Sequence, residues 1–136
     1  MAADDSGNET TVRSPFAELL DIHSLPGSDG MGKASMTIQH KHLQEQGVVQ
    51  GGIIVALADY AFHRAVASVL NPGQHAVTIE LKTNFISPAR EGELTATARL
   101  ISRGRRVLVG DVEVLDREGT LIARCLGTYL ALAQRT

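Results

Sequence analysis

The sequence predicts an α+β domain in which one antiparallel sheet of five to six strands wraps around a single long central helix. A long apolar segment, residues 53–70, has hydrophobic residues that recur with the period of a helix. Runs with the alternation typical of strands lie before and after it, at residues 31–41, 75–86, 93–101, 107–115 and 121–133. Short turns join the last of these runs, which favours antiparallel neighbours. A single sheet can bury such a helix only by curling around it.

The first elements of the chain follow local rules. Ser14 suits the N-cap of a helix and Pro15 suits its first position, so a short helix is expected over residues 16–22. The central helix is apolar over most of its circumference, which is typical of a buried helix. It carries Asp59 and His63 near its middle, which argues against a membrane span.

The strand expected at 75–86 has a simple alternation. It places one apolar set on one face, comprising Val77, Ile79, Leu81 and Phe85. Thr78 is then expected on the opposite face. Such a sheet around one helix leaves a face or an edge without a partner, so a homo-oligomer is expected.

Length and composition limit the function. The chain has 136 residues and a net charge of −2, so nothing favours nucleic acid or an anionic membrane as a partner. Cys125 is the only cysteine, which excludes an intramolecular disulfide and a thiolate zinc cluster. Residues 1–13 are polar, without the apolar core of a signal peptide, and are expected to form a disordered lead-in. Residues 14–136 are expected to form one domain, in the cytoplasm.

The candidate chemistry centres on Asp59. A carboxylate in an apolar helix needs partners, and the sequence leaves two interpretations open: an ion pair, with Arg64 or another subunit, or a catalytic group. Gly51 and Gly52 open the helix, whose first N–H groups suit an oxygen that gains negative charge, although a turn can need small residues for its own sake. His63 is one turn after Asp59 and is expected to line the site. One His–Asp pair provides too few ligands for a metal, so no metal site is predicted.

Four stretches together resemble a known family. Residues 44–52 read Gln-Glu-Gln-Gly-Val-Val-Gln-Gly-Gly, and residues 56–61 read Ala-Leu-Ala-Asp-Tyr-Ala. Residues 81–89 end in Ser-Pro-Ala, and residues 127–129 read Gly-Thr-Tyr. The pattern resembles the hotdog-fold acyl-CoA thioesterases, in particular the phenylacetate-pathway (PaaI-like) subgroup, over residues 16–133.

This resemblance implies a hotdog fold and roles for particular residues. Asp59 is the general base or the nucleophile, the N–H of Gly51 polarises the thioester carbonyl, Gln44 positions the reactants and Thr78 helps hold the water. The residues expected to bind the substrate are Gln50, Gly52, His63, Lys82, Ser87, Arg105 and Arg106. Gln50 stands where the family usually has histidine, and we interpret this position as one that ties the turn together.

The resemblance also implies the partners. The substrate is an acyl-CoA and no cofactor is expected, because coenzyme A is part of the substrate. The chain is expected to form a homodimer or homotetramer with the site at a subunit interface, so that Asp59 and Gln44 come from different chains. The acyl group is expected to be small; Tyr60, Phe62 and Phe85 suit either an aromatic pocket or an ordinary core.

Two alternatives stay open. The first is an enoyl-CoA hydratase or dehydratase of the same fold, although those relatives use a histidine–acid pair and the loop position here is Gln44. The second is a non-catalytic acyl-CoA-binding protein, which only the departure at Gln50 supports.

Overall fold

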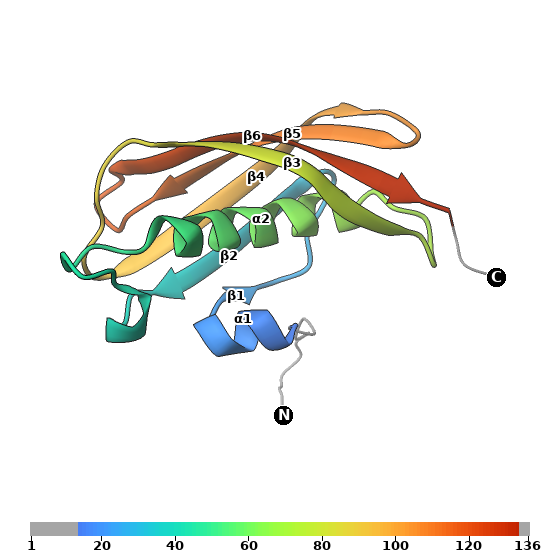
Figure 1. The fold of residues 1–136 in the computed structure, drawn as a ribbon. Coiled ribbons are helices and arrows are strands. Elements are labelled where there is room, and N and C mark those ends of the chain that lie inside the picture. The colour runs from blue at the N-terminus through green and yellow to red at the C-terminus, as the bar shows by residue number, and fades with distance from the viewer. Residues whose placement is uncertain (1–13, 134–136) are drawn as a thin grey trace.

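The structure, a computed structural model, describes residues 14–133; the predicted lead-in at 1–13 and residues 134–136 lie outside the described part. One antiparallel sheet of six strands, in the order β1-β2-β4-β5-β6-β3, curls along one long helix (Figure 1). The elements in chain order are α1 (Pro15–Leu20), β1 (His23–Ser24), β2 (Met31–Thr37), η1 (His40–His42), α2 (Gly51–Ala67), β3 (His75–Phe85), β4 (Glu93–Arg103), β5 (Val107–Leu115) and β6 (Leu121–Leu132). The predicted fold class is confirmed.

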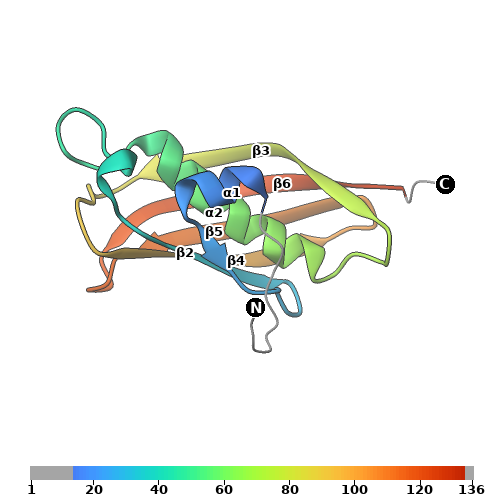
Figure 2. The same ribbon diagram turned by 90° about the horizontal axis from the view of Figure 1, so that it is seen from below.

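The central helix α2 begins two residues earlier and ends three residues earlier than the apolar pattern indicated. Its apolar residues form two neighbouring rows along the helix, and most of them are buried, as a helix enclosed by a curled sheet requires. The buried residues are Ile54, Leu57, Ala58, Ala61, Phe62, Ala65 and Val66. The shorter helix α1 lies on the side of α2 away from the sheet (Figures 1 and 2). None of the helices described in residues 14–133 is long and apolar enough to cross a membrane.

The N-terminal elements are held by local hydrogen bonds. The Ser14 side chain accepts from the N–H of Ala17, as predicted for an N-cap. The buried His42 accepts from the N–H of Gln39 through Nδ1, so its Nε2–H donates to the carbonyl of Leu20, 2.7 Å away. This histidine therefore ties η1 to the end of α1. The chain turns into η1 directly after β2. The strand predicted over residues 31–41 therefore stops at Thr37.

Two glycines make room for the largest buried side chain of α2. A Cβ on Gly127 would lie 2.8 Å from the Phe62 ring, and a Cβ on Gly110 would lie 2.9 Å from it. Tyr129 then packs against the same ring, with centroids 4.7 Å apart. Phe62 can approach the sheet this closely only because β5 and β6 have no side chain at these two positions.

A β-bulge in β3 changes which side chains face the helix. The register shifts between Thr78, opposite Tyr129, and Glu80, opposite Thr128, so Ile79 is an extra residue. Val77 and Ile79 are 47% and 55% exposed, whereas the Thr78 hydroxyl reaches Asp59 of α2. The prediction that Val77 and Ile79 share one face with Leu81, and that Thr78 points the other way, was therefore wrong. The alternation rule assumes a regular strand, and one inserted residue inverts it.

Candidate active site

Asp59 lies where α2 meets the strands β3 and β6. Its Oδ1 accepts hydrogen bonds from the Thr78 hydroxyl at 2.9 Å and from the Tyr129 hydroxyl at 2.8 Å. Within residues 14–133, no group donates a hydrogen bond to Oδ2 and no cation pairs with the carboxylate. One carboxylate oxygen is thus held and the other is available for chemistry.

Arg64 does not supply the ion pair that one interpretation of Asp59 required. Its guanidinium donates to Ser24 at 2.9 Å and to the Tyr60 hydroxyl at 3.0 Å, and lies over the Tyr60 ring. Two neutral hydroxyl donors therefore stabilise the Asp59 charge in place of a cation.

A cleft of about 400 Å³ opens beside this carboxylate. Its wall is mostly apolar, and the hydroxyls of Thr78 and Tyr129 meet Asp59 within it, the composition expected for a small-molecule site. The lining residues are Ser14, Phe16, Ala56, Asp59, Tyr60, His63, Ala76, Val77, Thr78 and Tyr129. The size and the wall suit a small apolar group held next to a polar reacting centre.

Tyr129 was not among the site residues predicted from the sequence. It is only 2% exposed, and burial together with the neighbouring Asp59 charge raises the pKa of its phenol far above the usual value. It therefore stays protonated and acts as a hydrogen-bond donor. The Gly-Thr-Tyr motif indicated that this part of β6 resembles the family. No pattern in the neighbouring sequence predicts its contact with a carboxylate 70 residues earlier.

His63, expected from the sequence to line the site, lies in the wall of the cleft beside Asp59. Burial, followed by the nearby Arg64 charge, lowers the pKa of its imidazole, and the Asp59 charge opposes this shift. Its ring centroid lies 6.2 Å from that of Tyr129. It makes no hydrogen bond with Asp59 within the described residues, so it forms part of the wall and not a dyad.

The start of α2 forms a second candidate region. The N–H groups of Gly51 and Gly52 have no acceptor among residues 14–133. Gln50 occupies the N-cap position, but its exposed side chain makes no capping bond; its backbone N–H donates to the carbonyl of His42. Within one chain the backbone N–H of Gln50 thus holds the turn against η1. Its side chain does not cap α2, so the first N–H groups of the helix stay available to a ligand.

A cavity of about 320 Å³ lies against this helix start and includes Ser87. Its lining residues are Val48, Val49, Gly51, Ile54, Phe85, Ile86, Ser87, Pro88 and Ala89. Gln44 is in the loop just before, where its side-chain amide exchanges hydrogen bonds with Gln46. The predicted residues Gln44, Gln50, Gly51, Gly52 and Ser87 thus gather at one end of α2.

These two regions do not converge within one chain. Gly51 and Asp59 are eight positions apart on the same helix, which separates them by about 12 Å along its axis. A single carbonyl cannot contact both the donors of Gly51 and the carboxylate of Asp59 in the same subunit.

The predicted coenzyme A contacts are also dispersed. Lys82 pairs in register with the exposed Leu126 and bonds to Asn84, on the sheet face away from α2. Arg105 and Arg106 lie in the β4–β5 turn, which contacts the last residues of β6. This turn is near the start of β3, whereas Ser87 follows the end of β3 (Figure 1). Within one chain these residues do not form one phosphate site with Ser87.

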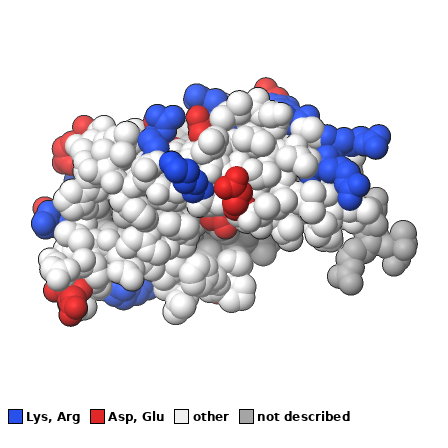
Figure 3. Space-filling view, turned by 45° about the horizontal axis from the view of Figure 1, so that its top comes forward, with Lys and Arg blue, Asp and Glu red and all other residues white. Residues whose placement is uncertain are grey.

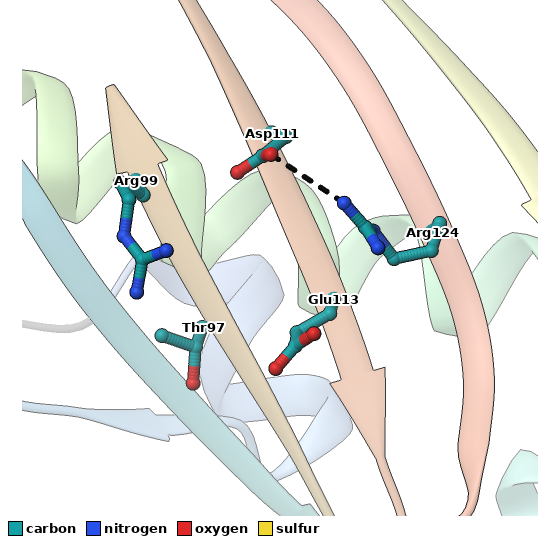
Figure 4. Close-up of a pocket in the computed structure, with 5 residues that line it drawn as sticks. All are labelled: Thr97, Arg99, Asp111, Glu113 and Arg124. Atoms are coloured by element: carbon teal, nitrogen blue, oxygen red, sulfur yellow. Dashed lines mark ion pairs between the residues drawn. The ribbon is translucent and has the colours of Figure 1, made fainter. Parts of the chain in front are cut away.

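The outer face of the sheet has its own hollow, of about 70 Å³. Figure 4 shows Thr97 and Arg99 from β4, Asp111 and Glu113 from β5, and Arg124 from β6, with an Asp111–Arg124 ion pair of 3.5 Å. Figure 3 shows charges of both signs interspersed over this face. Its walls are polar, so it does not suit an acyl chain, and cross-strand pairing of opposite charges accounts for it. The described residues contain no cluster of three His, Cys, Asp or Glu placed to hold a metal.

Comparison with known proteins agrees with this architecture. The family model of the thioesterase superfamily matches residues 46–123. A candidate esterase of Saccharolobus solfataricus is 35% identical over 90% of this chain and 81% of its own length. The Listeria monocytogenes protein named 1,4-dihydroxy-2-naphthoyl-CoA hydrolase is 26% identical over 79% of this chain and 89% of its own. The PaaI protein of Escherichia coli superimposes with a TM-score of 0.82 at 27% identity, over 89% of this chain and 86% of that one.

A helix enclosed by a curled antiparallel sheet defines the hotdog fold, and the match to the thioesterase superfamily gives the class: a hotdog-fold hydrolase. The chain belongs to the thioesterase superfamily. The predicted PaaI-like subgroup and the prediction of a thioester hydrolase are both confirmed.

Proposed function

We propose that this thioesterase hydrolyses a small acyl-CoA whose acyl group occupies the Asp59 cleft. The observation that carries the proposal is a carboxylate at the edge of an apolar cleft, with Oδ1 held by two hydroxyls and Oδ2 without a hydrogen-bond donor in the described chain. The aromatic residues Phe16 and Tyr60 in the wall suit a flat acyl group. The Listeria relative is named for the hydrolysis of such an aromatic acyl-CoA.

In the proposed reaction, Asp59 takes a proton from water as the water oxygen bonds to the thioester carbon. The carbonyl oxygen becomes an oxyanion, and the N–H of Gly51 stabilises it. Collapse of the tetrahedral intermediate breaks the C–S bond, and the thiolate of coenzyme A takes up the proton. Gln44 and Thr78 position the reactants. No cofactor takes part.

Direct attack by Asp59 is the other possible route. The carboxylate would then form a mixed anhydride, which water hydrolyses in a second step. In a single turnover in ¹⁸O-labelled water, label in the Asp59 side chain would show direct attack followed by hydrolysis at the Asp59 carbonyl carbon, because the general-base route places the label only in the product acid.

We infer that a second copy of the chain completes the site. The separation of about 12 Å between Gly51 and Asp59 supports this, because the donors must then come from another subunit. Within the described residues β3 pairs only with β6, so its other edge is open, and Val77 and Ile79 are exposed on this strand. A homodimer joined at β3 is the minimum assembly, and a homotetramer can be built from two such dimers. Lys82, Arg105, Arg106 and Ser87 then bind coenzyme A from two chains.

The test is thiol release from a panel of aromatic, short-chain and medium-chain acyl-CoA thioesters. The parent is expected to hydrolyse at least one, and Asp59→Asn to lower kcat by about 10²–10⁴-fold. Asp111→Asn is the matched control, because it removes a carboxylate on the outer face of the sheet. A parent that binds coenzyme A but releases no thiol would instead support the non-catalytic binder. Loss of the enoyl absorbance of crotonyl-CoA without release of thiol would support the hydratase.

A further inference from the structure

Tyr129 is the most rigidly placed group at the Asp59 carboxylate. Strand β6 lies inside the sheet, and Tyr129 is paired on one side with Leu108 and on the other with Thr78. Its ring packs on Phe62, which fits against the sheet over Gly110 and Gly127. The phenol therefore has little freedom to move.

The Tyr129 hydroxyl contacts both the side chain and the backbone of Asp59. It lies 2.8 Å from Oδ1 and 3.2 Å from the backbone carbonyl oxygen of the same residue. Thr78, the other donor to Oδ1, is on the edge strand and more exposed. Of the two donors, Tyr129 is thus the better anchor for the orientation of the carboxylate.

We propose that Tyr129 is a positioning residue that holds Oδ1 of Asp59 and thereby directs Oδ2 toward the thioester or the attacking water. This inference rests on the thioesterase function proposed above. Tyr129 transfers no proton in this role: it keeps its hydrogen while Oδ2 does the chemistry. Among residues 14–133, the titratable side chains that contact the Tyr129 hydroxyl or ring are Asp59 and His63.

The raised pKa of the Tyr129 phenol supports the role, because burial and the Asp59 charge keep it protonated wherever the enzyme works. A permanent donor next to a carboxylate restricts the carboxylate to one rotamer without competing for its protons. Such support for a reacting group is what fixes its geometry to fractions of an ångström.

The kinetic test is Tyr129→Phe, which keeps the ring on Phe62 and removes only the hydroxyl. We expect kcat to fall about 10- to 100-fold with little change in KM. In the Asp59→Ala background the same substitution is expected to leave the residual rate unchanged, because there is no carboxylate to orient. Thr83→Val is the control, since it removes a hydroxyl that bridges β3 to Cys125 on β6 and does not contact Asp59; kcat is expected to stay at the parent value.

A second measurement keeps Tyr129 intact and needs no activity. The chain has two tyrosines, so with Tyr60→Phe the incorporation of 3-fluorotyrosine labels Tyr129 alone. Its ¹⁹F resonance is expected to move on Asp59→Ala and to stay in place on Asp111→Ala.

Each outcome decides the proposal. Parent-like kcat in Tyr129→Phe, an equal loss with and without the Asp59 carboxylate, or a fixed ¹⁹F resonance would each overturn it. If the parent hydrolyses no acyl-CoA while the resonance still moves, the thioesterase proposal fails, and the role of Tyr129 in that reaction fails with it. The contact between Tyr129 and Asp59 would still be confirmed.

Discussion

Thr78 and Tyr129 lie directly opposite each other in the β3–β6 ladder, and their hydroxyl groups donate to the same oxygen of Asp59. Two strands therefore hold a carboxylate that belongs to the central helix. The register of one strand pair, set partly by the bulge at Ile79, decides the geometry of this contact.

The first prediction concerns the Thr78 hydroxyl. Thr78→Val keeps the shape of the side chain but removes the donor, and a hydrogen bond to a charged group contributes about 1.5–3 kcal/mol. We expect kcat to fall roughly tenfold or more, while Thr78→Ser stays close to the parent. Equal losses in both variants would indicate that the methyl group, and not the hydroxyl, matters.

The second prediction tests whether the site is shared between subunits. Asp59→Asn and Gln44→Ala are each expected to be severely impaired. If the two residues act from different chains, half of a random mixture is mixed dimers, each with one intact site, so that about a quarter of the parental activity returns.

The control for this experiment is a mixture of Asp59→Asn with Asp59→Ala, which can form no intact site. Native mass spectrometry verifies that subunits have exchanged. Exchange without any recovery would place Gln44 and Asp59 of one site on the same chain.

The third prediction concerns the space for Phe62. Gly127→Ala places a Cβ within 2.8 Å of the Phe62 ring and of the Glu80 carbonyl oxygen, and such overpacking costs about 1–3 kcal/mol. Gly52→Ala is the matched substitution: its Cβ meets nothing within 4 Å, and alanine in a helix is favoured by about 0.5–1 kcal/mol over glycine.

Urea unfolding measures both variants. The free energy of unfolding is expected to fall for Gly127→Ala and to rise slightly for Gly52→Ala. A neutral Gly127→Ala would mean that Phe62 can withdraw from the sheet at no cost.

The fourth prediction is a pH dependence of stability from His63. Its pKa in the folded chain lies below the ordinary value of 6.5, so between the two values the unfolded chain binds more protons. The free energy of unfolding therefore decreases as the pH falls through 6.5 and towards the folded pKa. Urea unfolding at about pH 7.5 and about pH 5.5 is expected to show a larger loss for the parent than for His63→Gln. The same loss in both proteins would show that His63 does not contribute.

The sequence by itself determined the main elements and their order, but not the short strand β1 or the short helix η1. The apolar rows of α2, the alternation of β4 to β6 and the turns between them are local patterns, and each predicted element is present within a few residues. Asp59 was also evident, because a carboxylate in the middle of an apolar helix stands out without any knowledge of the fold. The motif at residues 44–61 then indicated which chemistry to expect.

Only the tertiary structure decided what meets Asp59. The bulge at Ile79 brings Thr78 to the helix face, and the β3–β6 register places Tyr129 opposite it. It also decided that Gly110 and Gly127 face Phe62. Periodicity along a chain reports which residues share a face locally, whereas these relations depend on long-range pairing and on one inserted residue, neither of which has a local signature.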